Sequence, residues 1–308
     1  MDLHERFRRA AIEQGIGEGE VTTFAEFLRF AIWTSPDYDG PLVGRSGGLP
    51  RLPVGMQWPS AGSRPLQFVA SFDCSALPRV DGLALPTEGS LLFFLDHEWA
   101  DEADDVAGEQ RYARVVYVPA GTDTATAPEP DHDEEMFYDS RRHFVEPERD
   151  LFAAVNAELP RWLEKDRDVR GGLPWSADRE HLGLHLPHKK QLRALVEKLW
   201  PPSRGADFRL GGYTSGIGEL ATEHMSSTPE TGMADKNLDA RQKAGELVIA
   251  PGGRDLHLEV EALRVMREWV PLVQFVPDSV YRGRFLIRHD DLAARRFDKA
   301  LSFTAFTE

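Results

Sequence analysis

The sequence predicts an α+β protein made of two similar halves, with mostly antiparallel sheets and flanking helices. Three observations support this fold class. Short apolar segments rich in β-branched and aromatic residues alternate with segments of helical spacing. Gly and Pro punctuate the strand-like segments at turn-like intervals. A similar order of motifs occurs twice along the 308 residues, which suffice for one large domain or two ordinary ones.

The first 40 residues predict a helical segment. Residues 1–15 have a helical pattern that ends at Gly15. Thr22 or Thr23 then caps a second helix, whose apolar face recurs at helical spacing as Phe24, Phe27, Leu28, Ala31 and Ile32. Residues 41–308 are expected to form a single α+β domain, with halves at about 41–150 and 205–308 and a helical connector at 151–204.

Strand and helix patterns alternate through that domain. The segments with strand patterns are 65–73, 89–96, 112–118, 269–276 and 283–288. Residues 119–135 are rich in Pro, Thr and acidic side chains and are expected to be a mobile loop. Residues 151–168 and 189–200 have helical patterns, and residues 214–246 become weakly helical. The run HLGLHL at 181–186 alternates like a short half-buried strand.

The charge balance argues against several classes of partner. Lys and Arg total 36 against 51 Asp and Glu, a net charge of −15. This balance opposes binding to a nucleic-acid backbone or an anionic membrane surface. Between Asp96 and Asp150 there are 17 acidic and 5 basic residues. A solvated loop region that aids solubility explains this excess, and an acidic surface for a basic protein partner is the alternative.

The single cysteine, Cys74, allows no internal disulfide and suits a reducing compartment. The N-terminus shows no cationic region followed by an apolar run, and no apolar window is long enough to span a membrane. We therefore expect a cytoplasmic protein that does not act at a membrane. The motifs that hold nucleotide phosphates, a nucleophilic serine or a catalytic zinc are missing, so no cofactor is expected.

The two halves echo each other in the order of their motifs. Each has a Gly-Gly turn, at 47–48 and 211–212, followed by a Pro-Leu strand that contains Gln-Phe-Val or Val-Gln-Phe-Val. Each then has a strand that Gly opens and Asp closes, at 89–96 and 283–290. A diverged internal duplication explains the echo, and chance matching of short apolar strands is the alternative. Duplication would place a cleft between the halves.

The same motifs resemble a known family. GGLPRLPVGMQWP at 47–59, PLQFVASFDCSALP at 65–78 and GSLLFFLD at 89–96 are similar to the N-terminal signature of the YwqG-like family, a bacterial family of unknown function. PLVQFVPDS and GRFLIRHDDLAARRFD resemble its closing motif, so the resemblance covers roughly 40–100 and 205–305. GGYTSGIGE at 211–219 departs from the family pattern. The resemblance implies a soluble α+β protein with a duplicated core and, for some relatives, an immunity or interaction role beside toxin genes. It brings no established catalytic residues.

Histidine and aspartate pairs close two equivalent strands. Asp96-His97 and His289-Asp290 stand where general acid–base pairs are often placed, and they are the catalytic candidates. The alternative is turn chemistry, in which Asp stops a strand and caps the next helix, as we expect of Asp291. Cys74 is expected to be a small buried residue rather than a nucleophile.

His181, His185 and His188 form the densest histidine cluster. On a helix, His181 and His185 would share a face as metal ligands can, but Gly183 and Pro187 oppose a helix. On a strand they would lie about 13 Å apart, too far for one ion. No metal site is therefore predicted.

Aromatic side chains adjoin both Gly-Gly turns. Trp58 and Tyr213 are plausible platforms for a ligand or partner. The further binding candidates are Arg51, Gln67, Asp73, Gln274 and Asp278. Gly47 and Gly48 are expected to be architectural, through positive φ or close backbone approach. The sequence thus predicts a non-enzymatic protein-interaction module with an acidic surface. The alternative is a hydrolase or lyase that acts on a small polar substrate in the cleft between the halves.

Overall fold

The computed structural model describes residues 2–103, 106–133, 137, 142–160, 163, 186–214, 228–276 and 281–306. The chain divides into two compact units. Unit 1 contains Met1–Phe30, Asn156–Pro202 and Gly212–Val270, and unit 2 contains Ala31–Val155, Ser203–Gly211 and Pro271–Glu308. Both units are therefore assembled from separate stretches of sequence, and the predicted boundary near residue 40 stays a prediction.

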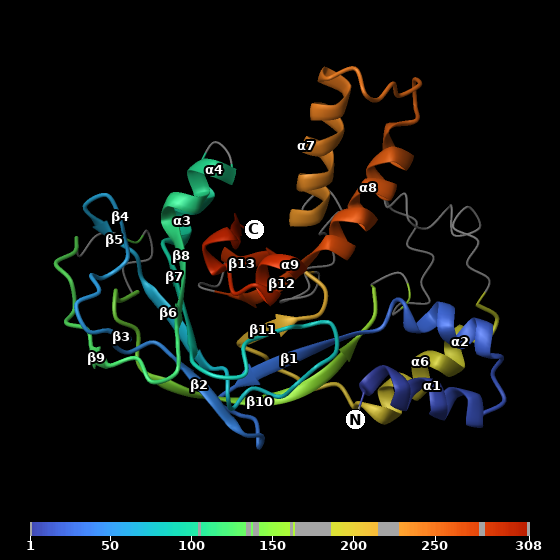
Figure 1. Cartoon of the computed structure of the whole chain (residues 1–308), viewed down its shortest axis with the longest axis horizontal. Helices are drawn as coiled ribbons and strands as arrows, with labels where there is room; N and C mark the ends of the chain where they lie inside the picture. The colour runs from blue at the N-terminus through green and yellow to red at the C-terminus, as the bar shows by residue number, and fades with distance from the viewer. Residues whose placement is uncertain are drawn as a thin grey trace. The chain divides into compact units, whose positions relative to one another are not determined.

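Unit 2 is built around a ten-stranded sheet (Figure 1). Its strands are β1 (Arg29–Ser35), β2 (Leu42–Ser46), β6 (Phe68–Asp73), β7 (Ser90–Leu95), β8 (Ala113–Val118), β10 (Arg149–Glu158), β11 (Phe208–Gly211), β12 (Trp269–Phe275), β13 (Tyr281–Arg288) and β14 (Leu301–Phe306). Every strand pair with a described register is antiparallel. Two small ladders join β3 (Arg51–Pro53) to β9 (Thr124–Thr126) and β4 (Ser60–Ala61) to β5 (Arg64–Pro65). The predicted mixed fold with antiparallel strands is confirmed.

The strand order of this sheet is symmetric about its centre. The order is β14-β13-β12-β11-β1-β10-β2-β6-β7-β8. The run β2-β6-β7-β8 and the run β11-β12-β13-β14 each follow the chain outward from the middle. Each central strand pairs with the run that it does not directly precede in the chain. β1, which directly precedes β2, pairs with β11, and β10, which directly precedes β11, pairs with β2.

The sheet curls until it is nearly closed, and phenylalanine rings fill its inner face. Phe93 on β7 contacts Phe285 on β13 with ring centroids 5.4 Å apart, and Phe72 on β6 contacts Phe208 on β11 at 5.8 Å. Gly283 on β13 permits this packing, since a Cβ there would lie 2.6 Å from the Phe275 ring. The two strand runs therefore meet through an aromatic core.

The helices differ in length between the two units. Those of unit 1 are α1 (Leu3–Glu13), α2 (Glu18–Ala25), α6 (Lys189–Leu199), α7 (Pro229–Lys243) and α8 (Arg254–Glu268). Those of unit 2 are the short α3 (His97–Asp101), α4 (Val106–Glu109), η1 (Gln110–Tyr112), α9 (His289–Ala293) and η4 (Phe297–Lys299). Among the described residues, no helix has both the length and the apolar character that crossing a bilayer requires.

Two strands of the sheet were predicted as helices. Residues 29–35 form β1, whereas the spacing of Phe24, Phe27, Leu28, Ala31 and Ile32 predicted a helix; α2 instead begins at Glu18 and ends at Ala25. Residues 149–158 form β10 where the sequence predicted a helix from 151. Phe30, Ala31 and Ile32 are all buried, and an apolar run without alternation does not distinguish a central strand from a helix.

Other sequence predictions have mixed outcomes. The strands predicted at 65–73, 89–96, 112–118, 269–276 and 283–288 and the helix at 189–200 are confirmed. The stretch 119–135 is not all loop, because β9 lies within it. No element was predicted at 254–268, where α8 forms. The strand predicted at 181–186 falls outside the described residues except for Leu186.

The first Gly-Gly turn follows β2 and has the geometry expected of it. Gly47 and Gly48 have φ of +65° and +66°. A Cβ on Gly47 would lie 2.4 Å from the carbonyl oxygen of Pro147, and the Gly48 N–H donates to Glu146 O at 2.8 Å. Both positive φ and close backbone approach therefore hold this turn, which confirms the architectural prediction.

Gly47→Ala is expected to lower the free energy of unfolding by at least about 2 kcal/mol, since it adds a backbone clash to an unfavourable φ. The matched control is Gly55→Ala, because Gly55 has φ +86° but nothing within 4 Å of a Cβ. We expect that control to lose only about 1 kcal/mol. Equal losses in urea denaturation would show that close approach does not matter at Gly47.

Candidate functional site

Asp96, the first catalytic candidate, lies between the last residue of β7 and the first residue of α3. Its carboxylate accepts a hydrogen bond from the Trp99 N–H at 3.4 Å and forms an ion pair with the Arg64 guanidinium. The Asp96 side chain is fully buried, whereas Arg64 keeps 24% of its side chain exposed. Asp96 thus caps α3, as the turn-chemistry alternative predicted.

Arg64 reaches this carboxylate from the small hairpin of β4 and β5. Its guanidinium carbon also lies 5.3 Å from the centre of the Trp99 ring. The Arg64 cation thus contacts the Asp96 carboxylate and the face of the Trp99 ring, and both contacts suit guanidinium. No motif marks Arg64 in the sequence, so sequence reasoning missed it.

His97 is enclosed by aromatic rings. Its imidazole is fully buried, stacks on Phe137 with centroids 5.6 Å apart, and meets the edge of Tyr281 at 4.8 Å. Its Nε2 lies 4.0 Å from the Glu98 carboxylate. A general base must reach its substrate, so the burial of His97 gives little support to a catalytic role.

Gln67 and Trp58 hold neighbouring chain segments onto the outer face of β6 and β7. The Gln67 amide donates to the carbonyls of His143 and Phe144, and its oxygen accepts from Arg142 at 3.2 Å. The Trp58 indole N–H donates to Leu66 O at 2.8 Å, and its ring packs on Phe94 and Phe144. The structure thus brings four predicted residues together: Trp58, Gln67, Asp96 and His97. Their geometry is that of a framework, and their predicted roles in binding or catalysis stay predictions.

The second catalytic pair lies away from the first. Tyr281, which contacts His97, begins β13, and His289 follows the last residue of this eight-residue strand. Such a strand extends about 26 Å, so the two His/Asp pairs stand at opposite ends of β13. Asp290 is exposed in the first turn of α9. The expectation that Asp291 caps this helix is wrong: α9 begins at His289, its N-cap is Arg288, and Asp291 pairs with Arg296 at 2.7 Å.

The other binding candidates have separate surroundings. Arg51 is exposed on β3 and donates to Thr124 O, and Asp73 accepts from the Ser75 N–H and hydroxyl in a tight turn. Tyr213 in unit 1 donates its hydroxyl to Phe27 O and lies under the Arg29 guanidinium at 4.4 Å. Gln274 is buried within β12.

Asp278, His181 and His185 lie outside the described residues, while His188 pairs with Glu20 at 2.7 Å. The predicted lack of a metal site stays a prediction.

Cys74 is fully buried next to Asp73. Burial disfavours the thiolate and, together with the Asp73 carboxylate, raises the pKa of Cys74 to about 11. The thiol is therefore protonated at neutral pH and unsuited to nucleophilic attack. The prediction of a small buried residue is confirmed.

A helical hairpin in unit 1, formed by α7 and α8, is a site that sequence reasoning missed (Figure 1). On its inner face, Ala234 of α7 packs with Ala262 and Val265 of α8. Asn237 of α7 donates a hydrogen bond to the buried Glu261 of α8 at 2.9 Å. On α8, each residue advances by about 100°, so Leu256, Val260 and Leu263 lie roughly opposite this inner face. This second apolar stripe is the kind of signal that hydrophobic periodicity can detect.

This outer stripe of α8 and the loop before it expose large apolar side chains. Val248 in the loop is 89% exposed, Leu256 is 48% exposed and Val260 is 55% exposed. We call Val248, Leu256 and Val260 the hairpin surface. Single exposed apolar residues are common, but several on one helical hairpin mark a surface that suits protein contact.

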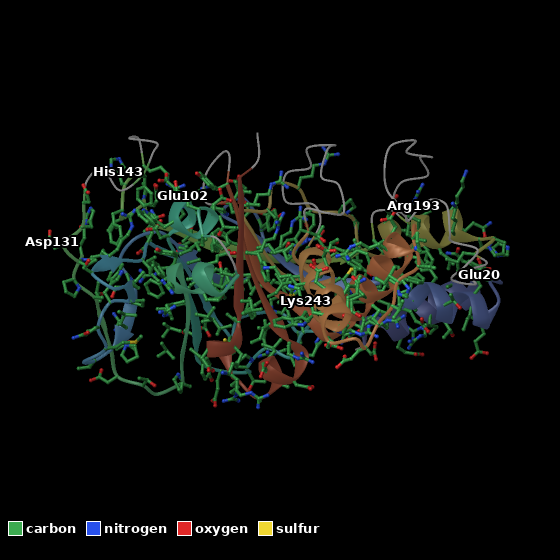
Figure 2. All side chains as sticks on the ribbon, turned by 90° about the horizontal axis from the view of Figure 1, so that it is seen from above. Glu20, Glu102, Asp131, His143, Arg193 and Lys243 are labelled. Atoms are coloured by element: carbon green, nitrogen blue, oxygen red, sulfur yellow. The ribbon has the colours of Figure 1, made fainter. Side chains whose placement is uncertain are left out.

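The acidic segment also exposes charge. Glu102, Asp123, Asp131 and Asp150 are exposed and form no ion pair within the described part of the chain. Figure 2 labels Glu102 and Asp131, whose side chains extend from unit 2. These carboxylates are available to a cationic partner.

A family model described as a domain of unknown function, DUF1963, matches residues 44–304. The chain belongs to the DUF1963 family. No curated protein matches this chain. The DUF1963 match begins within β2 and ends within β14, so it includes the hairpin surface and also Trp58, Gln67, Asp96 and His97, which we call the Asp96 framework.

Proposed function

We propose that this chain is a non-enzymatic protein-interaction module that binds a partner through the hairpin surface. The observation that carries this proposal is the exposure of Val248, Leu256 and Val260 on one helical hairpin. Covering a Leu or Val side chain contributes about 1.5–3 kcal/mol, so a few such anchors suffice for specific binding.

The charge of the chain supports a partner with a basic face. The net charge is −15, and Glu102, Asp123, Asp131 and Asp150 in the segment 96–150 are exposed and form no ion pair within the described residues. Such a field accelerates encounter with a basic protein, and the association rate should fall as salt is added. Nucleic acid and membrane partners have no such support.

The enzymatic alternative, a hydrolase or lyase acting on a small polar substrate, has less support. Asp96 and His97 are fully buried, and His289-Asp290 lies at the other end of β13. Phenylalanine rings occupy the inner face where the two strand runs meet, which is where the cleft was expected.

The proposal can be tested with a photo-reactive amino acid at Leu256 in native cells. We expect a cross-linked adduct of discrete mass, and Val260→Asp should reduce it about tenfold or more, since it places a charge in an apolar contact. The matched control is Ala240→Asp, which adds the same charge at an exposed position of α7. We expect this control to keep the adduct.

Two outcomes would contradict the proposal. One is the absence of an adduct at low salt, and the other is equal loss in Val260→Asp and Ala240→Asp. Thermal melting of both variants establishes that the fold is intact. The identified partner is then titrated with purified chain, with and without salt.

We also infer that the sheet arose by internal duplication. The strands β1, β2, β6, β7 and β8 recur in order as β10, β11, β12, β13 and β14, and the mirrored sheet order supports this equivalence. Comparison of the two halves across many relatives tests it. Similarity no greater than between shuffled segments would contradict the duplication.

Three finer assignments are part of this proposal. We place the chain with the YwqG-like proteins on the motifs at 47–59, 65–78 and 89–96. We place it in the cytoplasm on its single cysteine. A toxin gene beside the coding sequence would support an immunity-like role, and a biosynthetic cluster would favour the enzymatic alternative.

A further inference from the structure

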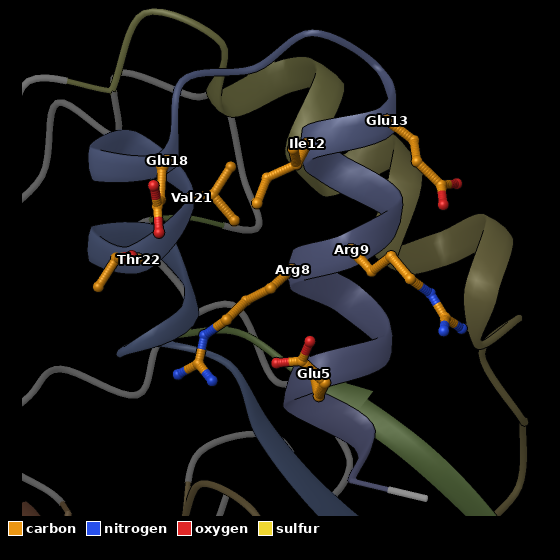
Figure 3. Close-up of a pocket in the computed structure, with 8 residues that line it drawn as sticks. All are labelled: Glu5, Arg8, Arg9, Ile12, Glu13, Glu18, Val21 and Thr22. Atoms are coloured by element: carbon orange, nitrogen blue, oxygen red, sulfur yellow. The ribbon is translucent and has the colours of Figure 1, made fainter.

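A hollow of about 300 Å³ lies between α1 and α2 in unit 1 (Figure 3). Its volume is at the lower end of the range for small-molecule sites. Its lining residues are Glu5, Arg8, Arg9, Ile12, Glu13, Glu18, Val21 and Thr22. The hollow is independent of the hairpin surface and of the Asp96 framework.

The inner wall of the hollow is apolar. Ile12 from α1 and Val21 from α2 point toward each other between the helices (Figure 3). Val21 is buried, whereas Ile12 remains 48% exposed, so an apolar group placed here would cover the Ile12 side chain. The site therefore favours a ligand with a short aliphatic body.

Charges of both signs surround this wall. Arg8 is half-buried and extends from α1 toward α2, whereas Glu5 and Glu18 lie at opposite ends of the hollow, in the first turns of α1 and α2 (Figure 3). Within the described residues, none of these three side chains forms an ion pair or a hydrogen bond. Their charges are thus available to a ligand. A guanidinium suits a carboxylate, which it can bind with two parallel hydrogen bonds.

We propose that this hollow binds a zwitterionic α-amino acid with an aliphatic side chain. Arg8 receives the ligand carboxylate, Glu18 on the facing helix receives the ammonium group, and the aliphatic side chain packs on Ile12 and Val21. An anion alone would face the Glu18 carboxylate, and a cation alone would face Arg8. A ligand that carries both charges satisfies both sides.

The test is a titration of the full chain with L-leucine, followed by calorimetry and by amide chemical shifts. Saturable shifts are expected in α1 and α2. Arg8→Gln is expected to weaken binding about tenfold, because it removes a charge-assisted hydrogen bond. The matched control is Arg9→Gln: Arg9 also borders the hollow, but its guanidinium points away from it and from Arg8 (Figure 3).

Two analogues test the carboxylate and the ammonium group of the ligand separately. Isocaproate keeps the carboxylate and aliphatic body of leucine, and isopentylamine keeps the amine, so each should bind about tenfold more weakly than leucine. Equal binding of isocaproate and leucine would overturn the zwitterion assignment. Absence of saturable shifts, or equal weakening by Arg8→Gln and Arg9→Gln, would overturn the site. Both variants change exposed or half-buried arginines, and thermal melting checks that they fold.

Discussion

Asp96→Ala is expected to lower the free energy of unfolding by about 2–4 kcal/mol. The substitution removes the buried carboxylate that pairs with Arg64, and it removes the cap of α3. Asp96 is fully buried, but Arg64 is 24% exposed and can gain water, so the loss stays below that of a wholly buried pair. Urea denaturation of the wild type and the variant measures the change.

Two further variants divide this effect. Asp96→Asn keeps a side-chain acceptor for the Trp99 N–H while removing the charge, so we expect it to lose less than Asp96→Ala. Asp290 is the exposed counterpart of Asp96 in the second predicted His/Asp pair. The free energy of unfolding of Asp290→Ala should stay within about 0.5 kcal/mol of wild type. Unchanged stability in Asp96→Ala would contradict the framework role and return Asp96 to the catalytic candidates.

The sequence predicted the outer strands of the sheet better than its centre. Residues 89–96 and 112–118 are apolar, rich in β-formers and bounded by turn residues or charges, so both strands were predicted. The central strands β1 and β10 were predicted as helices. β10 contains Ala153, Ala154 and Ala157, which favour a helix, and its place in the sheet between β1 and β2 overrides that preference.

The candidate site was predictable only in part, because its partners come from distant segments. Trp58, Gln67, Asp96 and His97 stand out in the sequence and lie together in the structure. Arg64 joins Asp96 from 32 residues away, and Arg142 joins Gln67 from 75 residues away. No spacing rule links such pairs. Burial was also hidden from the sequence, since an Asp-His pair after a strand has the same pattern whether it faces solvent or aromatic rings.

The outer edge of strand β14 forms hydrogen bonds with side chains rather than with another strand. The Gln110 amide accepts from the Ser302 N–H at 2.7 Å and donates to Ser302 O at 3.1 Å, as a neighbouring strand would. Glu109 accepts from the Thr304 N–H at 2.5 Å. Edge strands that are not covered invite pairing with other chains, so Glu109 and Gln110 protect this edge.

Glu109 should make stability fall as the pH rises. The residue is 8% exposed, and burial raises the pKa of its carboxyl to about 8, against the lowering effect of the Thr304 N–H. The Asp101 carboxylate nearby raises the pKa further. Between about pH 4.5 and 8 the folded chain therefore holds a proton that the unfolded chain has lost. This contribution is complete below about pH 4.5 and disappears as the pH rises through 8.

Glu109→Gln is expected to flatten this dependence. The glutamine oxygen can still accept from the Thr304 N–H but does not titrate. At pH 5 the variant and the wild type should have similar free energies of unfolding, and at pH 9 the variant should be more stable by about 3 kcal/mol. Cys74, with a pKa of about 11, titrates above this window.

Denaturation at several pH values, compared with the exposed control Glu102→Gln, measures the effect. We expect the Glu102→Gln curve to run parallel to that of the wild type. Hydrogen exchange at the Thr304 amide gives a local readout, because loss of the Glu109 contact above pH 8 should speed exchange in the wild type more than in Glu109→Gln. Parallel stability curves for the wild type and Glu109→Gln would show that the Glu109 carboxyl is not held protonated at this edge.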